Sequence, residues 1–213
     1  MMAEGKMREI EERARSFFGD VNPAHDWHHV QRVTELAEKL AEEEDADRKI
    51  VQASALLHDI GRGKEDEGLI DNHAEWGAEK SGEVLEELGF EDSFIEAVEH
   101  CIRSHRYSKR PDPRTLEAEV LSDADNLDAL GACGIARTFT YGGERGKIIA
   151  DPDLPADEDE SVAGKTSLNH LEKKILNLKD QMYTDSGLEV AEKRHRYVND
   201  FVERMKKEME GIK

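Results

Sequence analysis

Apolar residues recur with a helical period along nearly the whole chain, and the alternation typical of strands is almost absent. Between residues 26 and 44, for example, Val30, Val33, Ala37 and Leu40 fall on one face of a helix. The pattern predicts helices over residues 4–18, 26–44, 46–60, 73–88, 92–105, 115–130, 165–181 and 185–209. We therefore expect an all-α fold, a helical bundle with a C-terminal helix pair packed on it.

Two breaks interrupt this pattern. The first is the proline-containing stretch 108–113, and the second is the acidic stretch 151–160, which also contains prolines. A stretch of this composition cannot bury enough apolar surface to fix one conformation, so we expect a mobile loop over residues 142–163. The expected organisation is a single domain, 1–213, with a bundle over about 20–140 and accessory helices over about 165–210.

The helix predicted over residues 46–60 is apolar nearly all round, which indicates a central position in the bundle. It ends in the pair His58-Asp59. A buried imidazole needs partners for its nitrogens, and a buried carboxylate is costly without a cation. Since both groups are good ligands for divalent metals, the pair is a candidate metal site.

Other candidate ligands lie on separate predicted helices. His29 lies one turn before Val33, at the edge of the buried face, and the alternative is a surface histidine. Asp125 falls on the same side of its helix as the core, whereas Asp123 is expected to face solvent on the other side. Asp128 lies three residues further on and is positioned to accept a hydrogen bond from a metal-binding imidazole.

Charge limits the classes of partner. The formal net charge is -19 and 37% of the residues are charged, so most of the surface should repel a nucleic acid polymer. A small phosphorylated compound remains possible if one local site is basic. Two isolated cysteines form no disulfide framework, and no stretch resembles a signal peptide or a membrane span. We expect a cytoplasmic protein without membrane contact, and the sequence carries no signal for an oligomeric state.

The order His29, His58-Asp59, Asp125 resembles the HD superfamily of metal-dependent phosphohydrolases, in particular its small, single-domain bacterial and archaeal branch. The similarity covers nearly the whole chain. It is carried by residues 25–33, 57–61, 123–131, 134–137, 172–176, 182–184 and 191–194. The resemblance implies an all-α HD-domain bundle with His29, His58, Asp59 and Asp125 as metal ligands.

The same resemblance raises the question of a second ion. In relatives with two metals, histidines between the HD pair and the last aspartate bind the second ion, and His73 and His105 hold similar places in the order. However, His105 is followed by Arg106, whereas the familiar two-metal relatives have a His-His pair. The sequence therefore favours one ion, with two as the alternative, and the two histidines could instead contact substrate.

Arg62 follows the HD pair in a loop bounded by glycines, and Lys64 lies close by. A guanidinium beside a metal can hold phosphate oxygens. The alternative is a solvated loop in which the two cations pair with Glu65 and Asp66. We expect Arg62 to be the more important phosphate contact.

These features predict a metal-dependent phosphohydrolase that acts on a nucleotide or another small phosphate ester through a metal-activated water. The imidazole and carboxylate ligands suit Mn, Fe, Co, Ni or Zn. One alternative is a non-catalytic regulatory module that binds metal and nucleotide. Another is an oxygenase with two irons, as in some proteins of the HD fold.

Overall fold

All regular structure in the described part of the chain is helical. The structure is a computed structural model that describes residues 2–19, 25–106 and 111–212. The predicted all-α fold class is thus confirmed. Of the predicted break at 108–113, residues 108–110 lie outside the described ranges, and residues 111–113 are not helical.

Contacts between residues divide the chain into two compact units, 1–125 and 126–213. The boundary falls inside one helix, α7, Leu116–Asp128. The other helices of the first unit are α1 Met2–Arg15, α2 Trp27–Glu43, α3 Arg48–Leu57, α4 Arg62–Asp66, α5 His73–Glu87 and α6 Asp92–Ser104.

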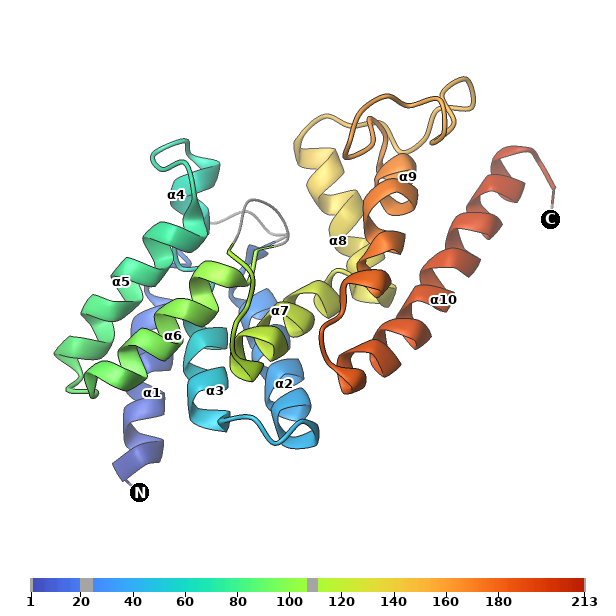
Figure 1. The fold of residues 1–213 in the computed structure, drawn as a ribbon. Coiled ribbons are helices and arrows are strands. Elements are labelled where there is room, and N and C mark those ends of the chain that lie inside the picture. The colour runs from blue at the N-terminus through green and yellow to red at the C-terminus, as the bar shows by residue number, and fades with distance from the viewer. Residues whose placement is uncertain (1, 20–24, 107–110, 213) are drawn as a thin grey trace. The chain divides into compact units, whose positions relative to one another are not determined.

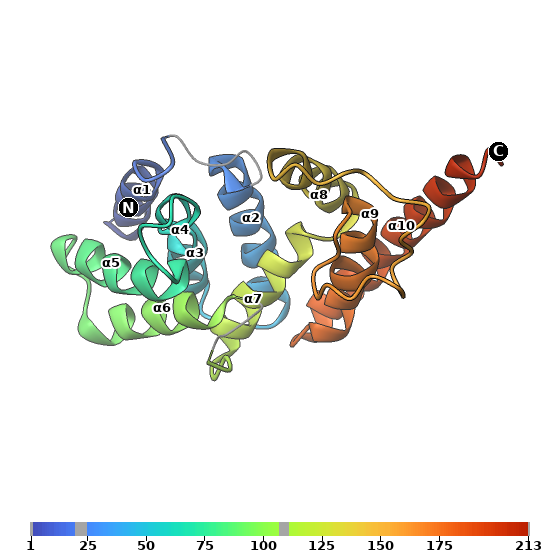
Figure 2. The same ribbon diagram turned by 90° about the horizontal axis from the view of Figure 1, so that it is seen from above.

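The helix α3 occupies the centre of the first unit, as its apolar sequence predicts. It contacts α1, α2, α5 and α6, and Figures 1 and 2 show it surrounded by these helices. Val51, Ala53, Ala55 and Leu57 are fully buried within it. The polar pair His58-Asp59 therefore follows directly from the central helix of this unit.

Two helices were not predicted. The short helix α4 lies within the segment expected to be a loop. None of its residues is buried, so it has no apolar stripe by which a helix could be recognised in the sequence. The second is α8, Gly131–Glu144. Its glycines weaken the helical propensity, yet two of them are required by close packing. A Cβ atom at Gly134 would collide with the carbonyl of Ala129, and one at Gly142 would collide with Ser167.

The second unit contains α8, α9 Ser167–His170 and α10 Asp185–Met209. The segment predicted as one helix over 165–181 instead continues from α9 into a π-helical turn, Leu171–Ile175, and a 3-10 helix, Leu176–Gln181. Within this unit α10 contacts α8 and the 3-10 helix. No helix among the described residues is both long enough and apolar enough to cross a membrane.

The acidic stretch before α9 contains one buried carboxylate. Asp159 is only 2% exposed. It accepts hydrogen bonds from the backbone of Ser161 (3.0 Å) and Lys165 (2.6 Å) and from the side chain of Asn169 (2.9 Å). These donors lower its pKa. The mobility of the stretch stays a prediction, and Asp159 and the carbonyl of Leu154 both tie it to Asn169 of α9.

Candidate metal centre

The candidate ligands lie at the ends of helices in the first unit. His29 lies in the first turn of α2, where its backbone N–H donates to the capping side chain of Asp26 at 3.0 Å. His73 is the first residue of α5, which Asn72 caps. His58 and His105 follow directly after α3 and α6. The four imidazoles are buried, with exposed fractions of 0–3%.

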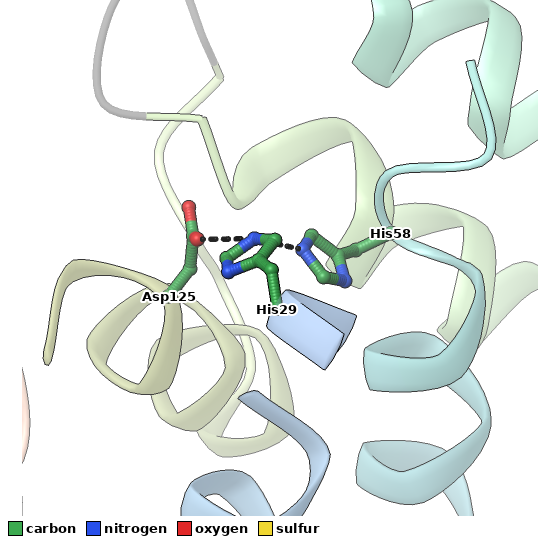
Figure 3. Close-up of side chains that lie close together, drawn as sticks. All are labelled: His29, His58 and Asp125. Carbon is green, nitrogen blue, oxygen red and sulfur yellow. Dashed lines mark hydrogen bonds and ion pairs between the residues drawn. The ribbon is translucent and has the colours of Figure 1, made fainter. Parts of the chain in front are cut away.

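The first group of ligands is His29, His58 and Asp125. Figure 3 shows His29 between the other two side chains, which come from different helices. His29 Nε2 lies 3.4 Å from His58 Nε2 and 3.5 Å from Asp125 Oδ1. We call these residues the first cluster, and one ligand atom of each lies within 4.8 Å of the others.

The second group is Asp59, His73 and His105, whose ligand atoms also lie within 4.8 Å of one another. We call it the second cluster. His73 Nε2 is 3.3 Å and His105 Nε2 is 3.8 Å from Asp59 Oδ1. His73 and His105, which the sequence could not assign, are thus brought to the same carboxylate.

Asp59 joins the two clusters, because its other oxygen faces the first one. Asp59 Oδ2 lies 3.5 Å from His29 Nε2 and 3.8 Å from His58 Nε2. One carboxylate therefore presents an oxygen to each group of imidazoles. This is an arrangement in which a single side chain can bind two cations at once.

Hydrogen bonds fix three of the imidazoles in the form that can bind a metal. His58 Nδ1 donates to the carbonyl of Ala55 at 2.7 Å, and His105 Nδ1 donates to the carbonyl of Ile102 at 2.6 Å. A carbonyl only accepts, so Nδ1 carries the proton and Nε2 has a free lone pair. His73 is fixed in the same way by a carboxylate, as shown below. The Nε2 atoms of these three rings lie 3.3–3.8 Å from the carboxylate of Asp59, so the residues fit a metal site.

The protonation states are also those of metal ligands. Burial lowers the pKa of His58, and burial together with His58 and His73 lowers the pKa of His105 to about 4. Burial alone would raise the pKa of Asp59, but His58, His29 and His73 outweigh it and hold this pKa well below the usual value. Neutral imidazoles beside an ionised carboxylate are the forms that bind divalent cations.

Arg62 lies beside the second cluster, on α4. Its Nη1 donates to Glu65 Oε2 at 3.0 Å and lies 3.3 Å from His73 Nδ1. Its Nε lies 3.9 Å from Asp66. Arg62 thus makes the ion pairs foreseen for a solvated loop, but it does so next to a buried candidate ligand. Lys64 instead lies over the ring of Trp76, 5.3 Å from the centroid.

Sequence analysis missed two residues at this position, Glu65 as a partner of His73 and Arg106 as a second cation. Arg106 Nη1 donates to Glu65 Oε1 at 2.9 Å. Burial alone would raise the pKa of Glu65, but His73, Arg62 and Arg106 lower it. No periodicity marks either residue, and the only signal was the high local density of charges.

The aspartates near the end of α7 differ from the expectation in one respect. Asp123 is fully buried, so the prediction that it faces solvent is wrong. Asp128 is also buried and accepts a hydrogen bond from Arg137 Nη1 at 2.8 Å, within the second unit. A role for Asp128 in orienting an imidazole stays a prediction.

Comparison with known proteins identifies the family. The sequence model of the HD domain matches residues 26–130. The uncharacterised protein YpgQ of Bacillus subtilis is 35% identical over 206 residues, which cover 93% of this chain and 91% of YpgQ.

Solved structures agree with this result. An HD-superfamily hydrolase from Bacillus thuringiensis has a TM-score of 0.78 and 36% identity, with 98% of each chain covered. YpgQ of Bacillus subtilis, solved in complex with ADP, has a TM-score of 0.77 and 30% identity, with 97% of this chain and 100% of YpgQ covered. The HD pair lies where the two ligand clusters meet, and relatives that match nearly the whole chain are found both among sequences and among solved structures. The chain therefore belongs to the HD superfamily of hydrolases.

Proposed function

We propose that this protein is a metal-dependent phosphohydrolase that cleaves a nucleotide or another small phosphate ester. The observation that carries the proposal is the pair of clusters joined by Asp59, with the Nε2 atoms of four imidazoles 3.3–3.8 Å from its two oxygens. Such a set of ligands is suited to holding cations where a phosphate group and a water molecule can meet.

Two ions are proposed, although the sequence alone favoured one. The first would be held by His29, His58, Asp59 and Asp125, and the second by Asp59, His73 and His105. The His-His pair of two-metal relatives is not needed, because His73 and His105 reach Asp59 from different helices. The mixture of imidazole and carboxylate ligands suits Mn, Fe, Co, Ni or Zn.

Bound divalent ions would lower the pKa of a water molecule and offset the charge that develops on the phosphoryl oxygens. The protein's own residues hold and orient the reacting groups. The carbonyls of Ala55 and Ile102 keep the protons of His58 and His105 on Nδ1, away from the reaction. Arg62 and Arg106 provide guanidinium donors on one side of the second cluster, where phosphate oxygens can be bound.

Two observations support a nucleotide as substrate. The relative YpgQ was solved in complex with ADP, so a homologue that covers nearly the whole chain binds a nucleotide. In this chain, two arginines adjoin the candidate metal centre of a protein whose formal net charge is -19. Two guanidinium groups beside bound divalent cations would favour a small anion, and the acidic remainder of the protein disfavours a nucleic acid polymer.

Removal and return of metal tests the proposal. Protein treated with a chelator should lose hydrolysis of every phosphate ester in a panel of nucleotides and small monoesters and diesters. Addition of Mn, Fe, Co, Ni or Zn should restore release of phosphate or nucleoside monophosphate from at least one of them. Metal and nucleotide binding without turnover would instead indicate a regulatory module. Two bound irons with turnover only under dioxygen would indicate an oxygenase.

Substitution of Arg62 tests the phosphate contact. We expect Arg62→Ala to lower kcat/KM by about 10- to 100-fold, since a hydrogen bond between charged groups contributes about 1.5–3 kcal/mol. Arg62→Lys should restore only part of the loss, because an ammonium group cannot form the bidentate contact. Metal content should stay unchanged in both variants.

The matched control for this series is Lys64→Ala, a change of equal charge in the same short helix. Lys64 is exposed and lies over Trp76, so its removal should leave the kinetics near those of the unaltered protein. If Arg62→Ala behaved like Lys64→Ala on the true substrate, Arg62 would be a partner of Glu65 and Asp66 only.

A further inference from the structure

One carboxylate on α4 meets three donors at the edge of the second cluster. Glu65 Oε2 lies 2.8 Å from His73 Nδ1 and 3.0 Å from Arg62 Nη1. The other oxygen, Oε1, lies 2.9 Å from Arg106 Nη1. The side chain of Glu65 is only 16% exposed, so these contacts are largely shielded from solvent.

The contact with His73 determines which nitrogen of that ring carries the proton. A neutral ring carries one proton, and Glu65 Oε2 at 2.8 Å from Nδ1 is a nearer acceptor than Asp59 Oδ1 at 3.3 Å from Nε2. Arg62 Nη1, which lies 3.3 Å from Nδ1, donates to Glu65 Oε2 at the shorter distance of 3.0 Å. Nδ1 is therefore the protonated nitrogen. The lone pair of His73 is left on Nε2, which is the atom 3.3 Å from Asp59 Oδ1.

The same carboxylate also sets the positions of both arginines. Arg62 comes from α4, and Arg106 follows the end of α6. Arg106 is held in addition by Asn72 Oδ1, at 3.3 Å, and Asn72 is the cap of α5, the helix that begins with His73. Removing the charge of Glu65 would thus disturb one candidate metal ligand and two phosphate donors together.

We propose that Glu65 is a positioning residue of this site, which fixes the tautomer of His73 and holds Arg62 and Arg106 for the substrate phosphate. The proposal rests on the proposed phosphohydrolase function for its kinetic consequence. Its structural consequence, the tautomer of His73, can be measured without any substrate. Nothing in the spacing of the HD motif singles out Glu65; its three contacts do.

The test is Glu65→Gln, with Glu67→Gln as the matched control, because Glu67 is exposed two residues along the same chain segment. A glutamine offers one acceptor oxygen where the carboxylate offers two, so it cannot serve all three donors. We expect kcat/KM to fall by about 10- to 100-fold in Glu65→Gln, the usual effect of losing a partner of a metal ligand. Glu67→Gln should stay within about twofold of the unaltered protein, as expected for an exposed site.

The readout specific to positioning is the histidine ¹⁵N spectrum of the metal-stripped protein. His73 should be protonated on Nδ1 in the unaltered protein and in Glu67→Gln, and should become a mixture of tautomers in Glu65→Gln. Glu65→Ala, which has no acceptor at all, should shift the mixture further towards Nε2–H. Circular dichroism should show that each variant retains its helices.

The results separate this inference from the proposed function. An unchanged His73 tautomer in both Glu65 variants would overturn the role of Glu65, whatever the enzyme does. Absence of phosphatase activity in the unaltered protein, together with the expected tautomer change, would uphold the positioning of His73 and reject the phosphohydrolase.

Discussion

Asp59→Ala is expected to remove bound metal from both clusters and to abolish hydrolysis of the substrate. The reason is that Asp59 alone faces both groups of imidazoles, with Oδ2 at 3.5 Å from His29 and Oδ1 at 3.3 Å from His73. The loss should exceed the roughly 10- to 100-fold effect of removing a residue that only supports a ligand. Elemental analysis of the purified variant measures the metal, and a phosphate-release assay measures the activity.

The control for this experiment is Asp71→Ala, which removes an exposed carboxylate shortly before α5. It should retain both metal and activity. Far-UV circular dichroism should show the helical content of Asp59→Ala unchanged, because the fully buried apolar residues of α3, among them Val51 and Leu57, are unaffected by the change. A normal metal content in Asp59→Ala would reject the assignment of Asp59 as a shared ligand.

The second large effect concerns the number of ions. We expect two ions per chain in the unaltered protein and one in His105→Ala, with hydrolysis lost. His105 belongs only to the second cluster, where its Nε2 lies 3.8 Å from Asp59 Oδ1. Loss of that ion would halve the positive charge of the divalent ions that stabilise the phosphoryl group during hydrolysis. Metal analysis and an anomalous-scattering map of crystals are the measurements.

A histidine outside the clusters provides the comparison. His28 is exposed and its ring contacts Gln31 at 3.1 Å, so His28→Ala should keep both ions. One ion in the unaltered protein and one in His105→Ala, with only turnover reduced, would contradict the two-ion proposal. That outcome would return His105 to the role of a substrate contact, as the sequence first suggested.

The helices that could be predicted from the sequence are those with an apolar stripe. The amphipathic helix α2 and the nearly all-apolar α3 were found with ends only a few residues from those observed. The helix α8 was missed because its glycines lower helical propensity, and their reason is close packing that only the fold reveals. The short α4 was missed because it buries no residue.

Some residues of the candidate site could also be predicted from the sequence, whereas others could not. His58 and Asp59 could be singled out because polar residues at the end of an apolar helix require partners. That Asp59 would face two groups of imidazoles could not be predicted, since it depends on where the ends of α3, α5 and α6 meet. Glu65 and Arg106 lie 41 positions apart and form a contact that no local pattern records.

The hydrogen bonds from His58 to Ala55 and from His105 to Ile102 have a consequence for how the protein would acquire a metal. Each ring is held by a carbonyl in the last turn of the helix that precedes it. Two of the six candidate ligands are therefore oriented by the folding of α3 and α6 themselves, unlike the ligands of small zinc modules, which are unfolded without metal. Ligands oriented in this way would let the protein release one ion and accept another without unfolding. The identity of the bound metal would then depend on which ions are available in the cell as much as on the affinity of the ligands.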